Sequence, residues 1–132
     1  MEHLIKIKEA HRYLDNAKDT LKKAGREDGY YKDPKYVSTA CETAYKGVLI
    51  ALDEYLQKKE RPIIKKKHQR KNEHDYTKTL AELNKTLLHL FNSAYHILHL
   101  DGYYDGVSDK DTIDLGFKKA ETIITGIEHN KF

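Results

Sequence analysis

The sequence predicts an all-α protein, an up-down-up-down bundle of four helices formed by residues 1–132 as a single domain. Apolar residues recur every three or four positions through most of the chain, which is the spacing of one face of an α-helix. They make up 39% of the 132 residues, enough for one hydrophobic core. Only two prolines interrupt the chain, so long helices are favoured.

The first helix is predicted over residues 2–23. Lys22 and Lys23 suit the negative end of the helix dipole, and Gly25 suits the left-handed residue that often follows a helix. The positions with helical spacing are Ile7, Ala10, Leu14, Ala17, Leu21 and Ala24.

The second helix is predicted over residues 34–59. Asp33 is expected to cap it, and Pro34 fits the first turn, where no backbone donor is lost. Its apolar arc is unusually wide, which indicates neighbours on more than one side.

A basic loop is predicted over residues 60–74. We call Lys58–Lys71 the basic segment, because it holds eight lysines and arginines and one acid, whereas the whole chain has a net charge of only +3. These cations are candidate contacts to the phosphates of a nucleic acid, although the segment contains no aromatic residue for stacking on bases. They are Lys58, Lys59, Arg61, Lys65, Lys66, Lys67, Arg70 and Lys71.

Two more helices are predicted over residues 75–101 and 109–129. Asp75 is the expected cap of the third helix, and Gly102 is expected to end it. Ser108 is the expected cap of the fourth helix, with Asp111 three residues later as an imperfect capping box.

A Gly-Tyr-Tyr triplet occurs twice, and each copy follows a predicted helix. In an up-down-up-down bundle the first and third connections lie at the same end, so the tyrosines of both copies should gather there. Two interpretations stay open: the rings fold back over the last helical turn as a plug, or they form an aromatic platform for a base or a partner. The tyrosines are Tyr30, Tyr31, Tyr103 and Tyr104.

Other candidate chemistry is weaker. His89, His96 and His99 share the third predicted helix, but His89 and His96 point away from its apolar stripe, so we expect a polar surface and no metal site. Cys41 lies on an apolar face and is expected to be a core residue. No cofactor motif is present. The single cysteine, which cannot form an internal disulfide, predicts a cytoplasmic protein. The charged N-terminus indicates no signal peptide, and the apolar runs are too short to span a membrane.

Several stretches resemble the HEPN family of small bacterial four-helix domains, which is common in toxin–antitoxin and nucleotidyltransferase-linked systems. "AKDTLKKAG" is similar to the end of that family's first helix, and "HDYTKTL" to the opening of its third helix. "YVSTACETAYKGVLIALDEYL" resembles its second helix, which is rich in alanine around a glutamate and a lysine, here Glu42 and Lys46.

This resemblance implies a homodimer that binds RNA or a cognate protein. Active HEPN members are ribonucleases with an Arg-x(4–6)-His motif near the start of the last helix, where this chain has neither residue. We therefore expect a non-catalytic binding module that contacts RNA through the basic segment. The alternatives are a metal-independent ribonuclease or toxin component using Arg61 with His68 or His74, and a scaffold that binds only proteins.

Overall fold

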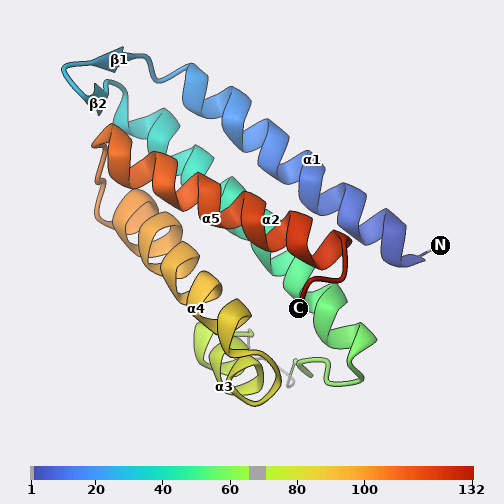
Figure 1. Ribbon diagram of the computed structural model, residues 1–132. Coiled ribbons are helices and arrows are strands. Elements are labelled where there is room, and N and C mark those ends of the chain that lie inside the picture. Colours follow the sequence, from blue (N-terminus) through green and yellow to red (C-terminus); the bar gives the residue numbers. More distant parts are fainter. Residues whose placement is uncertain (1, 66–70) are drawn as a thin grey trace.

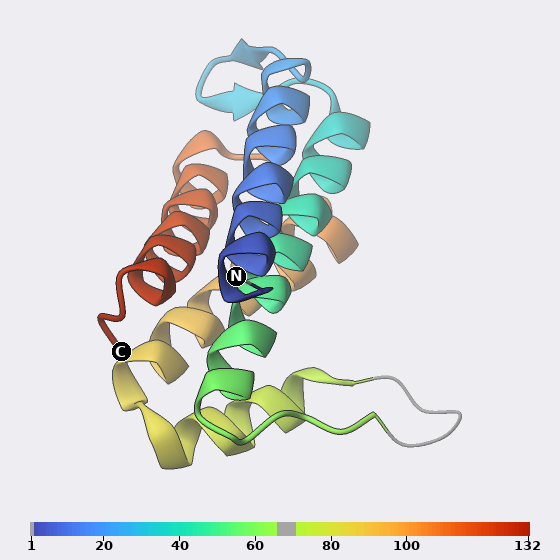
Figure 2. The same cartoon turned by 90° about the vertical axis from the view of Figure 1, so that its right-hand side faces the viewer.

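The computed structural model describes residues 2–65 and 71–132, and within these ranges most residues are helical. The elements are α1 (Glu2–Lys22), β1 (Arg26–Glu27), β2 (Tyr30–Tyr31), α2 (Pro34–Lys58), α3 (Glu73–Leu83), α4 (Lys85–Ala94), the π-helix η1 (Tyr95–Tyr104) and α5 (Lys110–Glu128). Figure 1 shows their arrangement, and Figure 2 shows the same fold from the side. The predicted bounds of the first, second and last helices are correct to within one residue.

Helix α2 is the centre of the fold and packs against α1, α5 and η1. It begins as predicted, with the Asp33 side chain accepting a hydrogen bond from the Lys35 amide and with Pro34 in the first turn. The wide apolar arc is explained by these three neighbours, because each covers a different side of α2. The buried residues of α2 are Val37, Ala40, Cys41, Ala44, Tyr45, Gly47, Val48, Ala51, Leu52, Tyr55 and Leu56.

The prediction of one continuous third helix was wrong. The chain breaks at Asn84, whose backbone is extended (φ −159°, ψ 108°) and whose side chain caps α4 by accepting from the Leu87 amide at 2.9 Å. The break turns α3 relative to α4 (Figure 2). Asparagine favours this position because its side chain replaces a missing helical hydrogen bond.

The beginning of α3 also differs from the prediction. Asn72 is the cap, and Asp75, the expected cap, is the third residue of a capping box in which each side chain bonds the other's backbone amide at 3.0 Å. The predicted loop over 60–74 therefore ends at Asn72.

Gly102 does not end the helix, contrary to the prediction. The chain continues as η1 to Tyr104, and the Asp105 amide donates to the Leu100 carbonyl at 2.9 Å, a π-type bond five residues back. Glycine is required here for a different reason: a Cβ at Gly102 would lie 2.9 Å from Cys41 Cβ on α2. The missing side chain thus lets η1 approach α2 closely.

A short hairpin joins α1 to α2. Asp28 and Gly29 both have positive φ (51° and 82°), which defines a two-residue type I′ turn, and the strands pair Arg26 with Tyr31 and Glu27 with Tyr30. The sequence carried the signal for this turn in its Asp-Gly dipeptide, which the helix-based prediction passed over.

The two tyrosine-bearing bends lie side by side. The Tyr31 amide donates to the Ser108 carbonyl at 2.9 Å, and the Lys110 amide donates to the Gly29 carbonyl at 2.8 Å. The expectation that Ser108 caps α5 was wrong. Asp109 is the cap, and its carboxylate accepts a hydrogen bond from the Thr112 amide at 3.0 Å. Ser108 contributes only its backbone carbonyl, to the bond with Tyr31. At the opposite end, Lys58 Nζ donates to Asn130 Oδ1 at 2.9 Å, so the basic segment begins beside the C-terminus.

Within residues 2–65 and 71–132, none of the helices has the length and apolar content that crossing a membrane requires.

Candidate functional site

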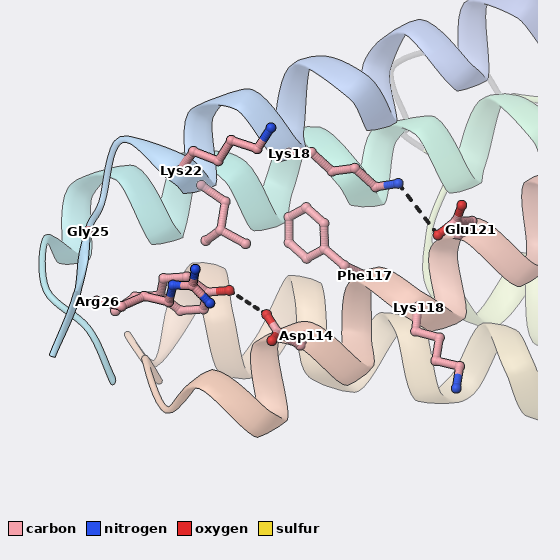
Figure 3. A pocket seen from close by; sticks show the side chains of 10 residues that line it. Lys18, Lys22, Gly25, Arg26, Asp114, Phe117, Lys118 and Glu121 are labelled. Atoms are coloured by element: carbon pink, nitrogen blue, oxygen red, sulfur yellow. Dashed lines mark hydrogen bonds and ion pairs between the residues drawn. The ribbon is translucent and has the colours of Figure 1, made fainter. Parts of the chain in front are cut away.

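The four tyrosines at the hairpin end have different environments. Tyr31 is buried (8% exposed), and its hydroxyl donates a hydrogen bond to Asp114 on α5, which Figure 3 shows. Tyr30, Tyr103 and Tyr104 are exposed. Tyr31 is therefore held within the fold, whereas the other three rings are exposed to solvent.

Asp114 holds two groups in place. Its Oδ2 atom accepts a hydrogen bond from Lys110 Nζ at 2.7 Å, and its Oδ1 atom accepts from the Tyr31 hydroxyl. Burial alone would raise the pKa of Asp114, but these two hydrogen bonds outweigh it and hold the pKa below the ordinary value. Burial, followed by the bond to Asp114, raises the pKa of Tyr31.

The lowered pKa of Asp114 predicts an acid-sensitive contribution to stability. A depressed folded-state pKa stabilises the fold above the unfolded-state pKa, about 3.9, and the contribution disappears as the pH falls through the folded-state value. Because the side chain is 41% exposed, we expect Asp114→Asn to cost only about 0.5–1 kcal/mol at pH 7. In urea unfolding this difference from the unmodified protein should shrink toward pH 2. Asp105→Asn, at an exposed position, is the control, and a difference constant with pH would contradict the assignment.

Most described cations of the basic segment have partners within the chain. The Lys59 ammonium lies 5.5 Å from the centre of the Tyr55 ring, and Arg61 pairs with Glu82 on α3. Lys65 is exposed. The remaining predicted contacts of this segment, Lys66, Lys67 and Arg70, lie outside the described residues, as does His68 of the ribonuclease alternative.

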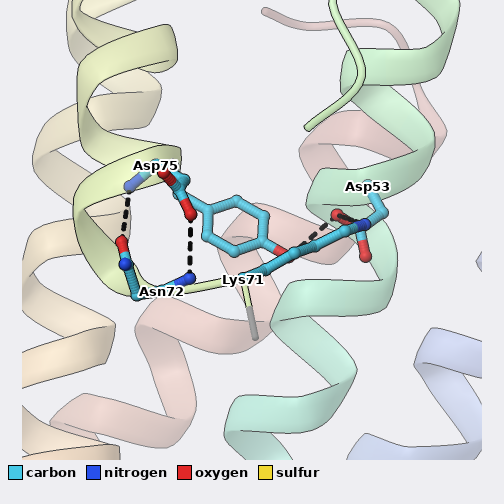
Figure 4. A network of polar contacts seen from close by, with 5 residues as sticks. Asp53, Lys71, Asn72 and Asp75 are labelled. Atoms are coloured by element: carbon cyan, nitrogen blue, oxygen red, sulfur yellow. Dashed lines mark hydrogen bonds and ion pairs between the residues drawn. The ribbon is translucent and has the colours of Figure 1, made fainter. Parts of the chain in front are cut away.

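Lys71 belongs to a polar network around Asp53, shown in Figure 4. Asp53 Oδ1 accepts a hydrogen bond from the Tyr76 hydroxyl at 2.8 Å and lies 3.4 Å from Lys71 Nζ. Burial is the main cause that raises the pKa of Tyr76, and the neighbouring Asp53 carboxylate adds to it. The capping box at Asn72 fixes the backbone just after Lys71 and so directs this lysine toward α2.

An open groove of about 400 Å³ runs along the outer face of α2 beside this network. Three lysines from separate parts of the sequence line it: Lys46, Lys65 and Lys71. Its apolar lining comes from Tyr13 on α1 and from Leu49 and Ile50 on α2. We call it the lysine groove.

An aromatic cluster lies farther along the same face of α2. The His99 ring is close to Tyr45 (ring centroids 4.8 Å apart), Tyr95 (5.5 Å), Tyr103 (5.9 Å) and Tyr104 (5.0 Å), and the first three contacts are stacked. We call these five residues the aromatic stack. Tyr45 is its buried base, and Tyr103 and Tyr104 are its exposed edge.

Glu42 orients the histidine of this stack. His99 Nδ1 lies 3.0 Å from Glu42 Oε1, and because a carboxylate only accepts, Nδ1 is the donor of this hydrogen bond. Glu42 and Lys46 are four residues apart on α2, so the residue that holds His99 and the first lysine of the groove differ by about 6 Å along the helix axis, one helical turn.

The sequence did not distinguish His99 from the other histidines of its region. His89 and His96 are exposed, as predicted, but His99 is half-buried because the π-helix rotates the chain and Gly102 brings η1 close to α2. Within the described ranges, no cluster of three or more His, Cys, Asp or Glu side chains is arranged to hold a metal ion.

Cys41 is fully buried, as predicted, beneath Gly102. Burial raises the pKa of its thiol to about 12, so the thiolate is scarce at neutral pH and the side chain is a core residue.

The ribonuclease alternative places Arg61 with a histidine. Arg61 is bound at Glu82 in the last turn of α3, and His74 lies in the first turn. Eight residues of α-helix separate these positions by about 12 Å along the axis. In this arrangement Arg61 and His74 do not share one site.

A comparison with solved structures finds a protein of unknown function from Dyadobacter fermentans. It is 42% identical to this chain and superimposes with a TM-score of 0.84, over 100% of both chains. No curated protein matches the sequence.

The model of the family described as "Domain of unknown function (DUF5618)" matches residues 5–129, nearly the whole chain. The chain belongs to the DUF5618 family.

Proposed function

We propose that this protein is a non-catalytic module that binds single-stranded RNA along the outer face of α2. The observation that carries the proposal is that the lysine groove and the aromatic stack lie along the same helix, with Lys46 of the groove one helical turn from Glu42, which holds His99 of the stack. Proteins that bind single strands combine these two features: cations that follow the phosphates, and aromatic rings on which bases stack.

The lysine groove is suited to phosphates. Lys46 and Lys65 are exposed, and Lys71 has Asp53 as its partner. An exposed ion pair contributes only about 0–1 kcal/mol, so a phosphate can replace Asp53 at small cost. Asp53 keeps the Tyr76 hydroxyl as its donor when this happens.

The aromatic stack is suited to bases that are not paired. Tyr104 is 67% exposed, and Tyr103 stacks on His99, whose ring is already held by Glu42. Stacking of a base on such a ring is worth about 1–3 kcal/mol and requires an unstacked, single-stranded base.

The HEPN-like four-helix bundle is part of this proposal. If α3, α4 and η1 are taken together as one broken third helix, the chain runs through α1, α2, this broken helix and α5, with the hairpin bend and the Gly102–Asp109 bend at one end. The HEPN resemblance implies a bacterial homodimer, and the absence of Arg-x(4–6)-His before α5 supports a non-catalytic role.

Binding to a labelled U12 RNA, followed by fluorescence anisotropy, tests the proposal. We expect Lys46→Gln/Lys65→Gln/Lys71→Gln to weaken binding at least tenfold and to reduce the slope of log K against log salt by about 2, since each phosphate contact to a single strand contributes about 0.7. Tyr103→Ala/Tyr104→Ala should also weaken binding at least fivefold, with the salt slope unchanged.

The matched control is Lys8→Gln/Lys23→Gln/Lys119→Gln, which removes the same charge from lysines outside the groove. The proposal fails if the groove variant and this control bind alike, or if no binding is seen at 50 mM salt. Cleavage of the RNA in metal-free buffer would instead favour the ribonuclease. Association without RNA binding, measured by light scattering and lost in Leu49→Glu/Ile50→Glu, would favour a homodimer or protein scaffold on this face.

A further inference from the structure

A second groove, of about 410 Å³, lies between the C-terminal half of α1, the hairpin and α5 (Figure 3). It is separate from the lysine groove. Lys18 of this groove and Tyr13 of the lysine groove are five residues apart on α1, which places them about 140° apart around the helix.

The floor of this groove is apolar. Leu21, Tyr31 and Phe117 line it, and they keep 6–8% of their surface exposed, whereas most of the core is at 0–3%. The hydroxyl of Tyr31 is bound to Asp114, so the orientation of its ring is fixed before any ligand arrives. A rigid, partly exposed apolar floor suits a flat apolar group.

The rim of the groove is cationic. Lys22, Arg26 and Lys118 are exposed, and no side-chain partner is found for them within the described residues. Arg26 is the cross-strand partner of Tyr31, so the two side chains lie on the same face of the hairpin. Lys18 is a fourth cation, but it pairs with Glu121 at 3.5 Å.

The negative charges of the groove are already neutralised. Asp114 is bound by Lys110 and Tyr31, and Glu121 by Lys18. The C-terminal end of α1 adds roughly half a negative charge, which is less than the three unpaired cations of the rim. The groove therefore retains a net positive charge above an apolar floor.

The geometry points to a binding site for a small organic anion, one that carries a phosphate or carboxylate group on a planar apolar body. The anionic group binds at the rim beside Lys22 and Arg26, with Lys118 farther off on α5 (Figure 3), and the planar body packs on Tyr31 and Phe117. This inference is independent of RNA binding, because the two grooves share no residue.

Phenyl phosphate is the probe, with inorganic phosphate and phenol as probes that each lack one half of the ligand. In an NMR titration of the full chain, we expect phenyl phosphate to shift the amides of Gly25, Tyr31 and Phe117 saturably. Its affinity should exceed that of either half-ligand by at least tenfold. Lys22→Gln/Arg26→Gln/Lys118→Gln should weaken it at least tenfold, and Lys8→Gln/Lys23→Gln/Lys119→Gln less than twofold.

A second variant tests the floor. Tyr31→Phe keeps the ring but removes the bond to Asp114, so the variant should still fold and should bind phenyl phosphate more weakly, with little change for inorganic phosphate. The inference is overturned if phenyl phosphate does not saturate, if inorganic phosphate binds equally well, or if the rim variant binds as the unmodified protein does.

Discussion

Replacing Phe91 with alanine is expected to lower the free energy of unfolding by roughly 3–5 kcal/mol. The ring is fully buried on α4 and lies 5.7–6.3 Å, between ring centroids, from Tyr45, Tyr76 and Tyr95. These neighbours belong to α2, α3 and η1, so the cavity would open where these three elements meet α4. The total free energy of unfolding of a single domain is about 5–15 kcal/mol, so this loss would be a large fraction of its stability.

Urea unfolding followed by circular dichroism measures the loss. Leu115→Ala on α5 is the control, because that side chain is 45% exposed and its truncation should cost less than about 0.5 kcal/mol. Leucine in Phe91→Leu fills most of the space left by the ring, so its loss of unfolding free energy should lie between those of the other two variants. If Phe91→Ala were as stable as Leu115→Ala, this would contradict the burial of the Phe91 ring among the three tyrosines.

The helices that the sequence predicted well are those whose signals are local. The bounds of α2 follow from Asp33, Pro34 and a long apolar arc, and α1 ends where Lys22, Lys23 and Gly25 indicate. Capping side chains and apolar spacing act within one or two turns, so a reader of the sequence can recognise them without knowing the tertiary contacts.

The parts that were missed depend on other signals. Asn84 interrupts an apolar stripe that otherwise continues in phase, so periodicity alone joined α3 to α4. Gly102 resembled a helix stop, because the sequence does not show that Cys41 of α2 lies against it. Asn84 thus acts as an ordinary helix cap within a continuous apolar stripe, whereas Gly102 serves close packing where a helix stop was expected.

The candidate sites show the same division. The sequence identified the charge of the basic segment, but the partners of Arg61 and Lys71 are set by the tertiary fold. The aromatic residues that the basic segment lacks come from α1 and η1, far away in the sequence. The fold thus places cations and aromatic rings from distant parts of the sequence along the same helix, α2.

Gly102→Ala is expected to cost about 1–3 kcal/mol of stability, the usual range for overpacking. The new methyl group would meet Cys41 Sγ and Cβ, the latter at 2.9 Å, and the Ile97 carbonyl at 3.2 Å. A Cβ atom and a carbonyl belong to or adjoin the backbone, so they yield less easily than the end of a long side chain. The gain of about 1 kcal/mol in helix propensity from glycine to alanine offsets only part of this cost.

The single cysteine makes this prediction specific to one contact. In the Cys41→Ala background the Sγ clash is absent while the Cβ contact remains, so the cost of Gly102→Ala should fall without vanishing, with a coupling of at least about 0.5 kcal/mol.

A thiol reagent such as DTNB gives a second readout. The buried thiol of the unmodified protein should react slowly, and Gly102→Ala, by moving η1 away from α2, should speed the reaction severalfold. Because η1 also carries His99 and Tyr103, the same displacement should weaken the bond to Glu42 and the aromatic stack. Additive free energies together with unchanged thiol reactivity would mean that Gly102 is not what holds these two helices together.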